Sequence, residues 1–258
     1  MRAVGLHEDV IAVTSRAFAT ASVLVRSGGE AFLIDSPVFP DELEILPAIA
    51  AQAEFNVVGV LATHADWDHL LGGYSFPDAA LATAETTAAR LRNEPGTAQR
   101  ELREFDDENY VERLGPLSLP TPQMLPVPGH CGIGAEELEL HPADGHTGDG
   151  MAILIPWASV LVCGDYLSPV EIPWISESGS ASAYLATLGR LEPLIERADH
   201  IVPGHGTVLD AERALAILRE DRAYLNALLE KGADAKLPLT RRTGAQKKIH
   251  AENVTRTR

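Results

Sequence analysis

The segment Val57–His69, VVGVLATHADWDH, joins an apolar run to a loop that is rich in potential metal ligands. Its first six residues are apolar and mostly β-branched or small, which is typical of a buried strand. The loop directly after this strand carries two imidazoles and two carboxylates, on His64, Asp66, Asp68 and His69. Imidazoles and carboxylates at this density indicate a metal site, and a polar loop with incidental histidines is the simpler alternative.

Three further potential ligands follow predicted strand ends elsewhere in the chain, in turns that contain glycine. They are His146 in Asp144-Gly145-His146-Thr147-Gly148, Asp165 after Leu161-Val162-Cys163-Gly164, and His205 in Pro203-Gly204-His205-Gly206. Glycine lets the backbone approach closely in such turns, and ligand sites in layered α/β proteins gather at strand ends. We therefore expect these three side chains to meet the opening cluster.

The order of these motifs resembles that of the metallo-β-lactamase superfamily. The resemblance rests on Thr63–His69, Gly145–Thr147, Gly164-Asp165 and Pro203–Gly206, which extend over residues 63–206. Each motif is weak alone, whereas all four in this order are specific. The resemblance implies an α/β (α+β) fold, a four-layer αββα sandwich, with a metal pair at one edge.

The resemblance also implies a ligand set for two divalent metal ions. The first ion would be bound by His64, Asp66 and His146. The second would be bound by Asp68, His69 and His205, with Asp165 bridging the two ions. A hydroxide between the ions would attack an electrophilic carbon or phosphorus, and Asp68 would be the catalytic residue that orients it and carries its proton. Zinc is the expected metal.

Asp66 departs from the superfamily pattern, which usually has a histidine at this position. Three aspartates contribute −3 against +4 from two divalent ions and leave +1, whereas the common pattern leaves +2. We expect the smaller charge to weaken Lewis acidity, and the harder oxygen ligand to make iron or manganese alternatives to zinc. Flavodiiron proteins have a glutamate here, but they also need a flavin domain, for which this chain has no spare length.

Two smaller departures concern the residues around the ligands. The superfamily commonly has one residue before a glycine pair, whereas here Leu70-Leu71 precede Gly72-Gly73, which affects the start of the next helix by one residue and not the ligands. The bridging position holds Asp165 and not the cysteine that is typical of zinc β-lactamases. Cleavage of β-lactams is therefore not favoured as the native activity.

The predicted strands and helices fall into two halves. In the first half, we expect strands near residues 10–13, 22–25, 31–35 and 57–62, a hairpin turn at 27–30 and a helix from Asp41 to about Ala53. In the second half, we expect strands near residues 137–141, 151–155, 160–163 and 200–202, and helices near 181–197 and 211–231. This pattern predicts two sheets with a helix layer outside each of them.

The chain of 258 residues is interpreted as one domain over residues 1–235 and a basic C-terminal tail over residues 236–258. From Lys236 onward the sequence has seven Lys or Arg residues and one acidic residue, Glu252. The tail could pair with the acidic body, pair with a neighbouring subunit, or form a solvated terminus. Residues 83–114, broken at 93–96, are predicted to be a helical insertion, either a lid or plain connecting helices.

Composition and charge exclude several classes of protein. The formal net charge of −16 argues against nucleic-acid binding, which needs cations to displace phosphate counterions. Residues 1–8 do not read as a signal peptide, and no apolar run approaches the roughly 20 residues of a membrane helix. Cys131 and Cys163 form no disulfide framework, and Cys163 is expected to be a buried structural thiol. We expect a cytoplasmic protein without membrane association.

The leading hypothesis is a metal-dependent hydrolase of a small ester, thioester, lactone or phosphoester. The alternatives are a non-haem diiron oxidoreductase, suggested by Asp66, and a metal-binding protein without catalysis. We expect a small-molecule substrate, with Trp67 and Trp174 as candidate walls of its pocket because aromatic side chains commonly line such sites. Core packing is the alternative for both tryptophans. The sequence is also compatible with a homo-oligomer.

Overall fold

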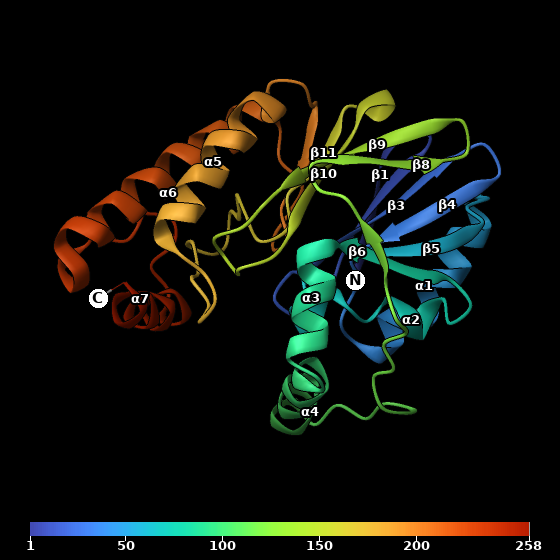
Figure 1. Cartoon of the computed structure of the whole chain (residues 1–258), viewed down its shortest axis with the longest axis horizontal. Coiled ribbons are helices and arrows are strands. Elements are labelled where there is room, and N and C mark those ends of the chain that lie inside the picture. Colours follow the sequence, from blue (N-terminus) through green and yellow to red (C-terminus); the bar gives the residue numbers. More distant parts are fainter. Residues whose placement is uncertain (258) are drawn as a thin grey trace.

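The computed structural model describes residues 1–257, whose strands form two facing β-sheets (Figure 1). The first sheet has seven strands in sequence order: β1 (Arg2–His7), β2 (Val10–Thr14), β3 (Ala21–Ser27), β4 (Glu30–Ile34), β5 (Val57–Ala62), β6 (Ala80–Ala84) and β7 (Gln123–Leu125). The strands β1 to β4 pair antiparallel, whereas β4 to β7 pair parallel. Helical segments connect the parallel strands, because a parallel pair needs a long crossover.

The second sheet has five strands. Their order is β12 (His200–Val202), β11 (Val160–Val162), β10 (Met151–Ile155), β9 (Glu136–Pro142) and β8 (Gly129–Ile133). All neighbours pair antiparallel except β11 and β12, which pair parallel. The connection between β11 and β12 contains the helix α5 (Ala181–Ile195), as a parallel crossover requires.

Helices lie outside each sheet and give four layers. On the side of the first sheet lie α1 (Pro40–Gln52), α2 (Gly72–Ser75), α3 (Glu85–Asn93) and α4 (Thr97–Asn109). On the side of the second lie α5, α6 (Ala211–Lys231) and α7 (Gly244–Arg256). Three short 3₁₀ turns complete the described elements: η1 (Trp67–His69), η2 (Pro156–Ala158) and η3 (Gly232–Asp234). In Figure 1, α5 and α6 lie on one side of the two sheets and α1 on the other, so the predicted αββα sandwich is confirmed.

Alternating side chains supply the apolar clusters between these layers. Leu61 of β5 and Ile153 of β10 both lie in the cluster between the two sheets. Their neighbours point the other way: Val60 packs in the cluster that contains α1, and Leu154 in the cluster that contains α5 and α6. Because successive side chains of a strand face opposite sides, an apolar run such as β5 fits a strand that is covered on both faces.

The strands and long helices predicted from the sequence are confirmed to within about two residues at each end. The strands β1, β6, β7 and β8 were not predicted. The sequence of β6 is rich in alanine and that of β8 contains two glycines, so each has only one of the β-branched residues that marked the other strands.

The helix α2 begins at Gly72, where a Cβ atom would lie 2.6 Å from the Val60 side chain. Glycine therefore lets this helix pack against β5.

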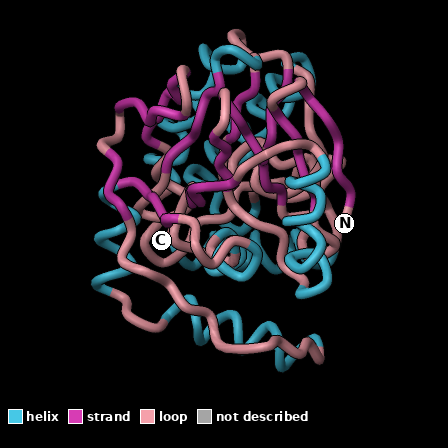
Figure 2. Tube along the Cα trace, turned by 90° about the vertical axis from the view of Figure 1, so that its right-hand side faces the viewer, coloured by secondary structure: helices cyan, strands magenta, loops and turns pink. Residues whose placement is uncertain are grey.

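The segment predicted as an insertion, residues 83–114, begins with the last two residues of β6 and continues as α3 and α4. Gly96, with a φ of 79°, separates the two helices. The segment extends away from the sheets in Figure 1, and Figure 2 shows a helix and a long loop in the corresponding place at the bottom of the molecule. Contacts join α4 to η1, which belongs to the ligand-rich loop. A role as a lid or as connecting helices stays a prediction.

The tail predicted from the charge pattern contains α7 within the described residues, which end at residue 257. Arg241, ahead of this helix, is buried completely and lies 2.6 Å from Asp221 and 3.1 Å from Glu220 of α6. Its guanidinium also donates to the backbone oxygens of Ser168 and Glu171, at 3.2 and 2.7 Å. The contacts with α6 favour pairing with the acidic body among the alternatives for the tail.

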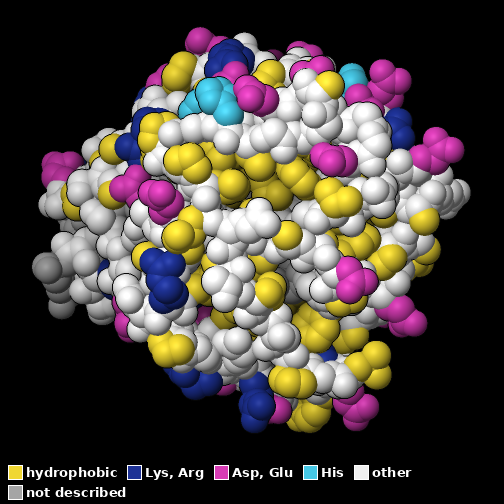
Figure 3. Space-filling model, turned by 45° about the vertical axis from the view of Figure 1, so that its right-hand side comes forward, with side chains coloured by type: hydrophobic (Ala, Val, Ile, Leu, Met, Phe, Trp, Pro, Cys, Tyr) yellow, Lys and Arg dark blue, Asp and Glu magenta, His cyan; other side chains and the backbone are white. Residues whose placement is uncertain are grey.

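The face seen in Figure 3 carries apolar side chains in its middle and acidic and basic side chains mostly around its edge. Among residues 1–257, no helix combines the length and the apolar character that crossing a bilayer demands. Cys163 is fully buried, as predicted for a structural thiol.

Replacing Arg241 by alanine is expected to destabilise the fold, because it leaves the buried Asp221 carboxylate without its partner. Loss of one partner from a buried ion pair costs about 3–5 kcal/mol. Urea denaturation should therefore show a lower free energy of unfolding for Arg241→Ala. Arg242→Ala is the control, since Arg242 is exposed. Equal stabilities of the two variants would contradict the anchoring role of Arg241.

Candidate metal centre

The loop after β5 is held by Asp35, which directly follows β4 and is fully buried. The Asp35 carboxylate accepts hydrogen bonds from the backbone nitrogen and the hydroxyl of Thr63, at 2.8 and 2.9 Å. It also lies 3.0 Å from Nδ1 of His69, a distance suited to an ion pair without the geometry of a hydrogen bond. One carboxylate therefore contacts both ends of the ligand loop.

The Thr63 hydroxyl, which binds Asp35, also positions His64. Because the Thr63 hydroxyl donates to Asp35, its oxygen accepts from Nδ1 of His64, which lies 3.0 Å away. The short turn η1 then brings His69 back beside His64, and the centroids of the two rings are 4.3 Å apart. Both imidazoles are thus held through Nδ1 and present Nε2 to the opposite side.

The other two histidines of the predicted set are held through Nδ1 as well. Nδ1 of His146 donates to the backbone oxygen of Trp174 at 3.0 Å, and Nδ1 of His205 donates to that of Phe18 at 3.2 Å. A carbonyl oxygen can only accept, so in both rings Nδ1 carries a proton and Nε2 is the atom free to bind a metal.

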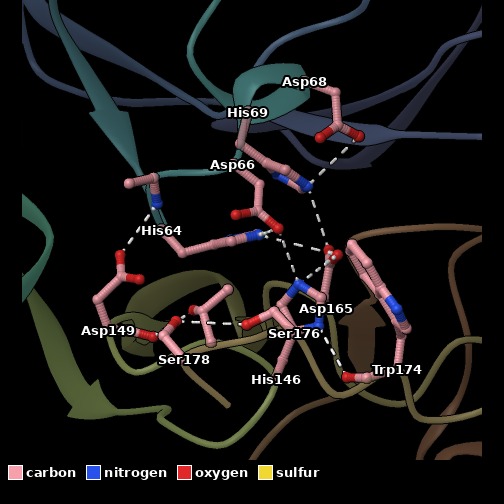
Figure 4. Close-up of polar contacts among 12 residues, drawn as sticks. His64, Asp66, Asp68, His69, His146, Asp149, Asp165, Trp174, Ser176 and Ser178 are labelled. Atoms are coloured by element: carbon pink, nitrogen blue, oxygen red, sulfur yellow. Dashed lines mark hydrogen bonds and ion pairs between the residues drawn. The ribbon is translucent and has the colours of Figure 1, made fainter. Parts of the chain in front are cut away.

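The structure brings the predicted ligands of the first ion together (Figure 4). Oδ2 of Asp66 lies 3.1 Å from Nε2 of His146 and 3.6 Å from Nε2 of His64. The ligand atoms of all three residues lie within 4.8 Å of one another. We name His64, Asp66 and His146 the first ligand group.

The predicted ligands of the second ion also converge. Oδ2 of Asp68 lies 3.8 Å from Nε2 of His69 and 3.7 Å from Nε2 of His205. Asp68, His69 and His205 are therefore named the second ligand group. The hydroxyl of Thr20 lies 3.3 Å from Oδ2 of Asp68 and 3.2 Å from the backbone oxygen of Ala17, and either oxygen can accept its proton.

Asp165 lies between the two groups. Its Oδ1 is 3.1 Å from Nε2 of His69, and its Oδ2 is 3.2 Å from Nε2 of His146 and 3.1 Å from Nε2 of His205. The approach depends on Gly204, where a Cβ atom would come within 2.0 Å of Oδ1 of Asp165. Asp165 thus contacts members of both groups, and its bridging role stays a prediction.

The charges of the centre shift the pKa values of its members. Burial alone would raise the pKa of Asp66 and Asp165, but the neighbouring imidazoles outweigh burial and hold both values well below the usual 3.8. Burial alone would lower the pKa of His146 and His205, but the carboxylates outweigh it and raise the pKa of His146 to about 9 and of His205 to about 10. The carboxylates therefore favour positive charge at this place.

The donor set fits divalent metal ions. Within residues 1–257, Nε2 of His64, Nε2 of His69 and Oδ1 of Asp165 are buried without a hydrogen-bond partner. Buried polar atoms of this kind are costly unless something binds them. Neutral imidazole and ionised carboxylate are the ligand forms that zinc, iron and manganese accept. A metal pair would therefore bind these atoms and take the place of the protons that the carboxylates favour on the imidazoles.

Three charged residues that support the ligand loop were not predicted from the sequence. Besides Asp35, these are Asp149 and Arg90. Asp149 is buried, and its Oδ2 accepts from the backbone nitrogen of Ala65 at 3.0 Å (Figure 4). Arg90 of α3 lies 2.8 Å from Oδ1 of Asp66 and donates to Oδ1 of Asp149 at 3.0 Å. Asp66 therefore has a guanidinium as its second partner.

Local sequence signals could have revealed Asp35 and Asp149 but not Arg90. Asp35 directly follows an apolar strand, and Asp68 and Asp165 follow apolar strands at a distance of a few residues. The expectation that ligands gather at strand ends could therefore have found Asp35. Asp149 is three residues from His146 in the same loop. Arg90 belongs to a polar helix and carries no local signal, because its partners Asp66 and Asp149 are distant in sequence.

A cleft of about 490 Å³ lies beside the two ligand groups. Its lining includes Asp66 and Asp68 from the loop, together with Trp67, Arg90, Glu94, Thr97, Glu101, Trp174, Ser176, Glu177, Ser178 and Arg256. Both tryptophans named as candidate substrate contacts thus line the cleft. The Trp67 ring also packs on Phe105 of α4, with ring centroids 4.8 Å apart. Contact of either tryptophan with a substrate stays a prediction.

The chain resembles one family of known proteins. The family model described as the metallo-beta-lactamase superfamily matches residues 15–205. A comparison with curated proteins gives no match.

Several solved structures are similar to this one. A metallo-beta-lactamase family protein from Thermus thermophilus has a TM-score of 0.69 and 22% identity, covering 97% of this chain and 94% of that one. A metallo-beta-lactamase from Pontibacter korlensis has a TM-score of 0.61 and 19% identity, covering 84% and 98%. The DIM-1 metallo-beta-lactamase has a TM-score of 0.61 and 19% identity, covering 87% and 96%. At these identities the likeness shows the fold.

Replacing Asp35 by asparagine is expected to weaken metal binding, because the loop loses the charge that faces His69. Loss of such a supporting group typically costs about 10–100-fold in metal affinity. The dissociation constant should be measured by competition with a chromophoric chelator. Asp107→Asn, on the exposed side of α4, is the control. Unchanged affinity in a folded Asp35→Asn variant would rule out this supporting role.

Proposed function

Because the chain belongs to the metallo-β-lactamase superfamily, we propose that it is a metal-dependent hydrolase of a small ester, thioester, lactone or phosphoester. The observation that carries the proposal is the convergence of two ligand groups on Asp165 beside a cleft. Asp66 and Asp68 belong to different groups, and both line this cleft. A substrate in the cleft would therefore meet both groups.

The proposed cofactors are two divalent metal ions, with zinc favoured and iron or manganese as alternatives because of Asp66. One ion would be held by His64, Asp66 and His146. The other would be held by Asp68, His69 and His205, with Asp165 as the shared ligand. Bound there, the ions would make water more acidic and polarise the substrate oxygen next to the bond that is cleaved.

Asp68 is the proposed catalytic residue. Its carboxylate lines the cleft, and its Oδ2 lies 3.3 Å from the Thr20 hydroxyl. A carboxylate in this place would accept the proton of the attacking water and deliver it to the leaving group as the bond breaks. His205 and His69 would keep Asp68 beside Asp165, since their Nε2 atoms contact both carboxylates.

The cleft supports a small-molecule substrate. Its volume falls within the roughly 300–1,000 Å³ of typical ligand pockets. Trp67 and Trp174 would supply apolar walls, whereas Glu101 and Ser178 would favour a substrate with polar groups. The net charge of −16 supports the proposal that nucleic acid is not a partner. A cytoplasmic location, the absence of a membrane partner and a homo-oligomeric state remain proposals from the sequence.

A diiron oxidoreductase is the second candidate, and one observation favours it. Oδ2 of Asp66 faces His146 at 3.1 Å, so a carboxylate takes part in the first ligand group. Carboxylate oxygen shifts the preference of a site toward iron or manganese. Elemental analysis that finds zinc and no iron in the purified protein would reject this candidate.

The proposed function is tested by elemental analysis combined with a panel of esters, thioesters, lactones and phosphoesters. We expect about two metal ions per chain and hydrolysis that stops on chelation and returns with metal. His205→Ala should lower the metal content to about one ion and reduce kcat/KM by at least about 100-fold, because the second ligand group loses a member.

His130→Ala provides the matched control, because His130 is exposed on β8 and should keep both ions and full activity. Full hydrolysis by both Asp66→Ala and His205→Ala would overturn the proposal. Two bound ions with no turnover on any substrate of the panel would support the alternative of a metal-binding protein without catalysis.

A further inference from the structure

We propose that the C-terminal helix α7 is part of the catalytic centre, with Asn253 as a residue that positions His146 through the backbone of Trp174. The inference rests on the proposed function, because His146 is a proposed metal ligand. The helix lies beyond the family match, which ends at residue 205.

The segment that α7 contacts is the loop between β11 and α5, which follows Asp165. Residues 168–178 of this loop contain no helix or strand. Backbone groups in such a loop need partners other than those of regular structure. Here several of these partners are side chains of the C-terminal segment. The loop matters for the centre because it carries the backbone oxygen of Trp174 that binds His146.

Asn253 clamps the two neighbours of Trp174. Its Oδ1 accepts from the backbone nitrogen of Ile175 at 2.9 Å, and its Nδ2 donates to the backbone oxygen of Pro173 at 2.7 Å. The side chain of Asn253 is fully buried, and Nδ2 also lies 3.1 Å from the hydroxyl of Tyr224 in α6. Both peptide groups that flank Trp174 are thereby tied to one rigid amide.

The same helix also holds the Trp174 side chain. The indole nitrogen donates to Glu252 at 2.9 Å, and the guanidinium carbon of Arg256 lies 5.4 Å from the ring centroid. Arg256 donates to the backbone oxygen of Ile175 and lines the cleft with Trp174. The helix α7 therefore contacts both the backbone around Trp174 and its indole ring.

The clamp reaches the ligand group in two steps. Asn253 sets the position of the Trp174 peptide, and its oxygen accepts from Nδ1 of His146 at 3.0 Å (Figure 4). The backbone nitrogen of Ser176 also donates to the backbone oxygen of His146, at 2.8 Å. A ligating imidazole needs such a contact behind it to fix its tautomer and ring orientation. Loosening the loop should thus affect His146 and the first ligand group, and leave the second group in place.

The test compares Asn253→Ala with Gln246→Ala in the full chain. Gln246 is a matched control, because it is also buried in α7 and accepts from a backbone nitrogen of the same loop, Ile172, at 2.8 Å. Ile172 does not flank Trp174. Both variants are expected to lose similar stability, since each leaves buried backbone groups unpaired.

Two measurements separate positioning from general destabilisation. Chelator competition should show that Asn253→Ala lowers the affinity for one of the two metal ions by about 10-fold or more, while Gln246→Ala keeps both affinities. Proton NMR should show a slowly exchanging Nδ1 proton of His146, assigned by its loss in His146→Gln. We expect this signal to persist in Gln246→Ala and to broaden or disappear in Asn253→Ala.

The outcomes distinguish this inference from the proposed function. A wild-type protein that binds no metal would overturn the proposed function, while the His146 proton signal would still test the clamp. Unchanged signal and unchanged metal affinities in a folded Asn253→Ala variant would overturn the inference. Equal effects of the two variants would overturn it too, because the helix would then act only through stability.

Discussion

The centre depends on the contacts behind its four imidazoles. Each Nδ1 atom lies 3.0 to 3.2 Å from one oxygen, and the oxygens belong to Thr63, Asp35, Trp174 and Phe18. With Nδ1 engaged, every ring presents Nε2 to the same place, where the Asp165 carboxylate lies. An imidazole without such a partner could turn or exchange its protonated nitrogen, and the ligand groups would lose their geometry.

These contacts explain why the arrangement of the two sheets matters for chemistry. Asp35 follows β4 and Thr63 follows β5 in the first sheet, whereas Asp165 follows β11 and His205 follows β12 in the second. The cluster between the sheets sets their separation and brings the strand ends to one edge. The close passage of Gly204 beside Asp165 shows how little space is left there. Packing in the core is therefore what gives the ligand distances their values.

Two helices outside the sheets, α3 and α7, supply polar partners to the centre. Oδ1 of Asp66 is engaged by Arg90, so Oδ2 faces the ligand group. Arg90 also contacts Asp149, which binds the loop backbone, so α3 is tied to the ligand loop. On the opposite side, α7 supplies the partners of the loop that carries Trp174. The cleft thus lies between two segments outside the sheets.

The two-sheet fold and the seven candidate ligands could be predicted from the sequence. Both rest on local signals, namely short continuous apolar runs and polar residues soon after them. Which groups support those ligands depends on contacts that exist only in the folded chain. Arg90 and Asp149 are 59 positions apart, and Asn253 and Ile175 are 78 apart. A hydrogen bond between distant residues leaves no periodic pattern in the sequence, because it depends on how separate elements pack and not on the propensity of either one.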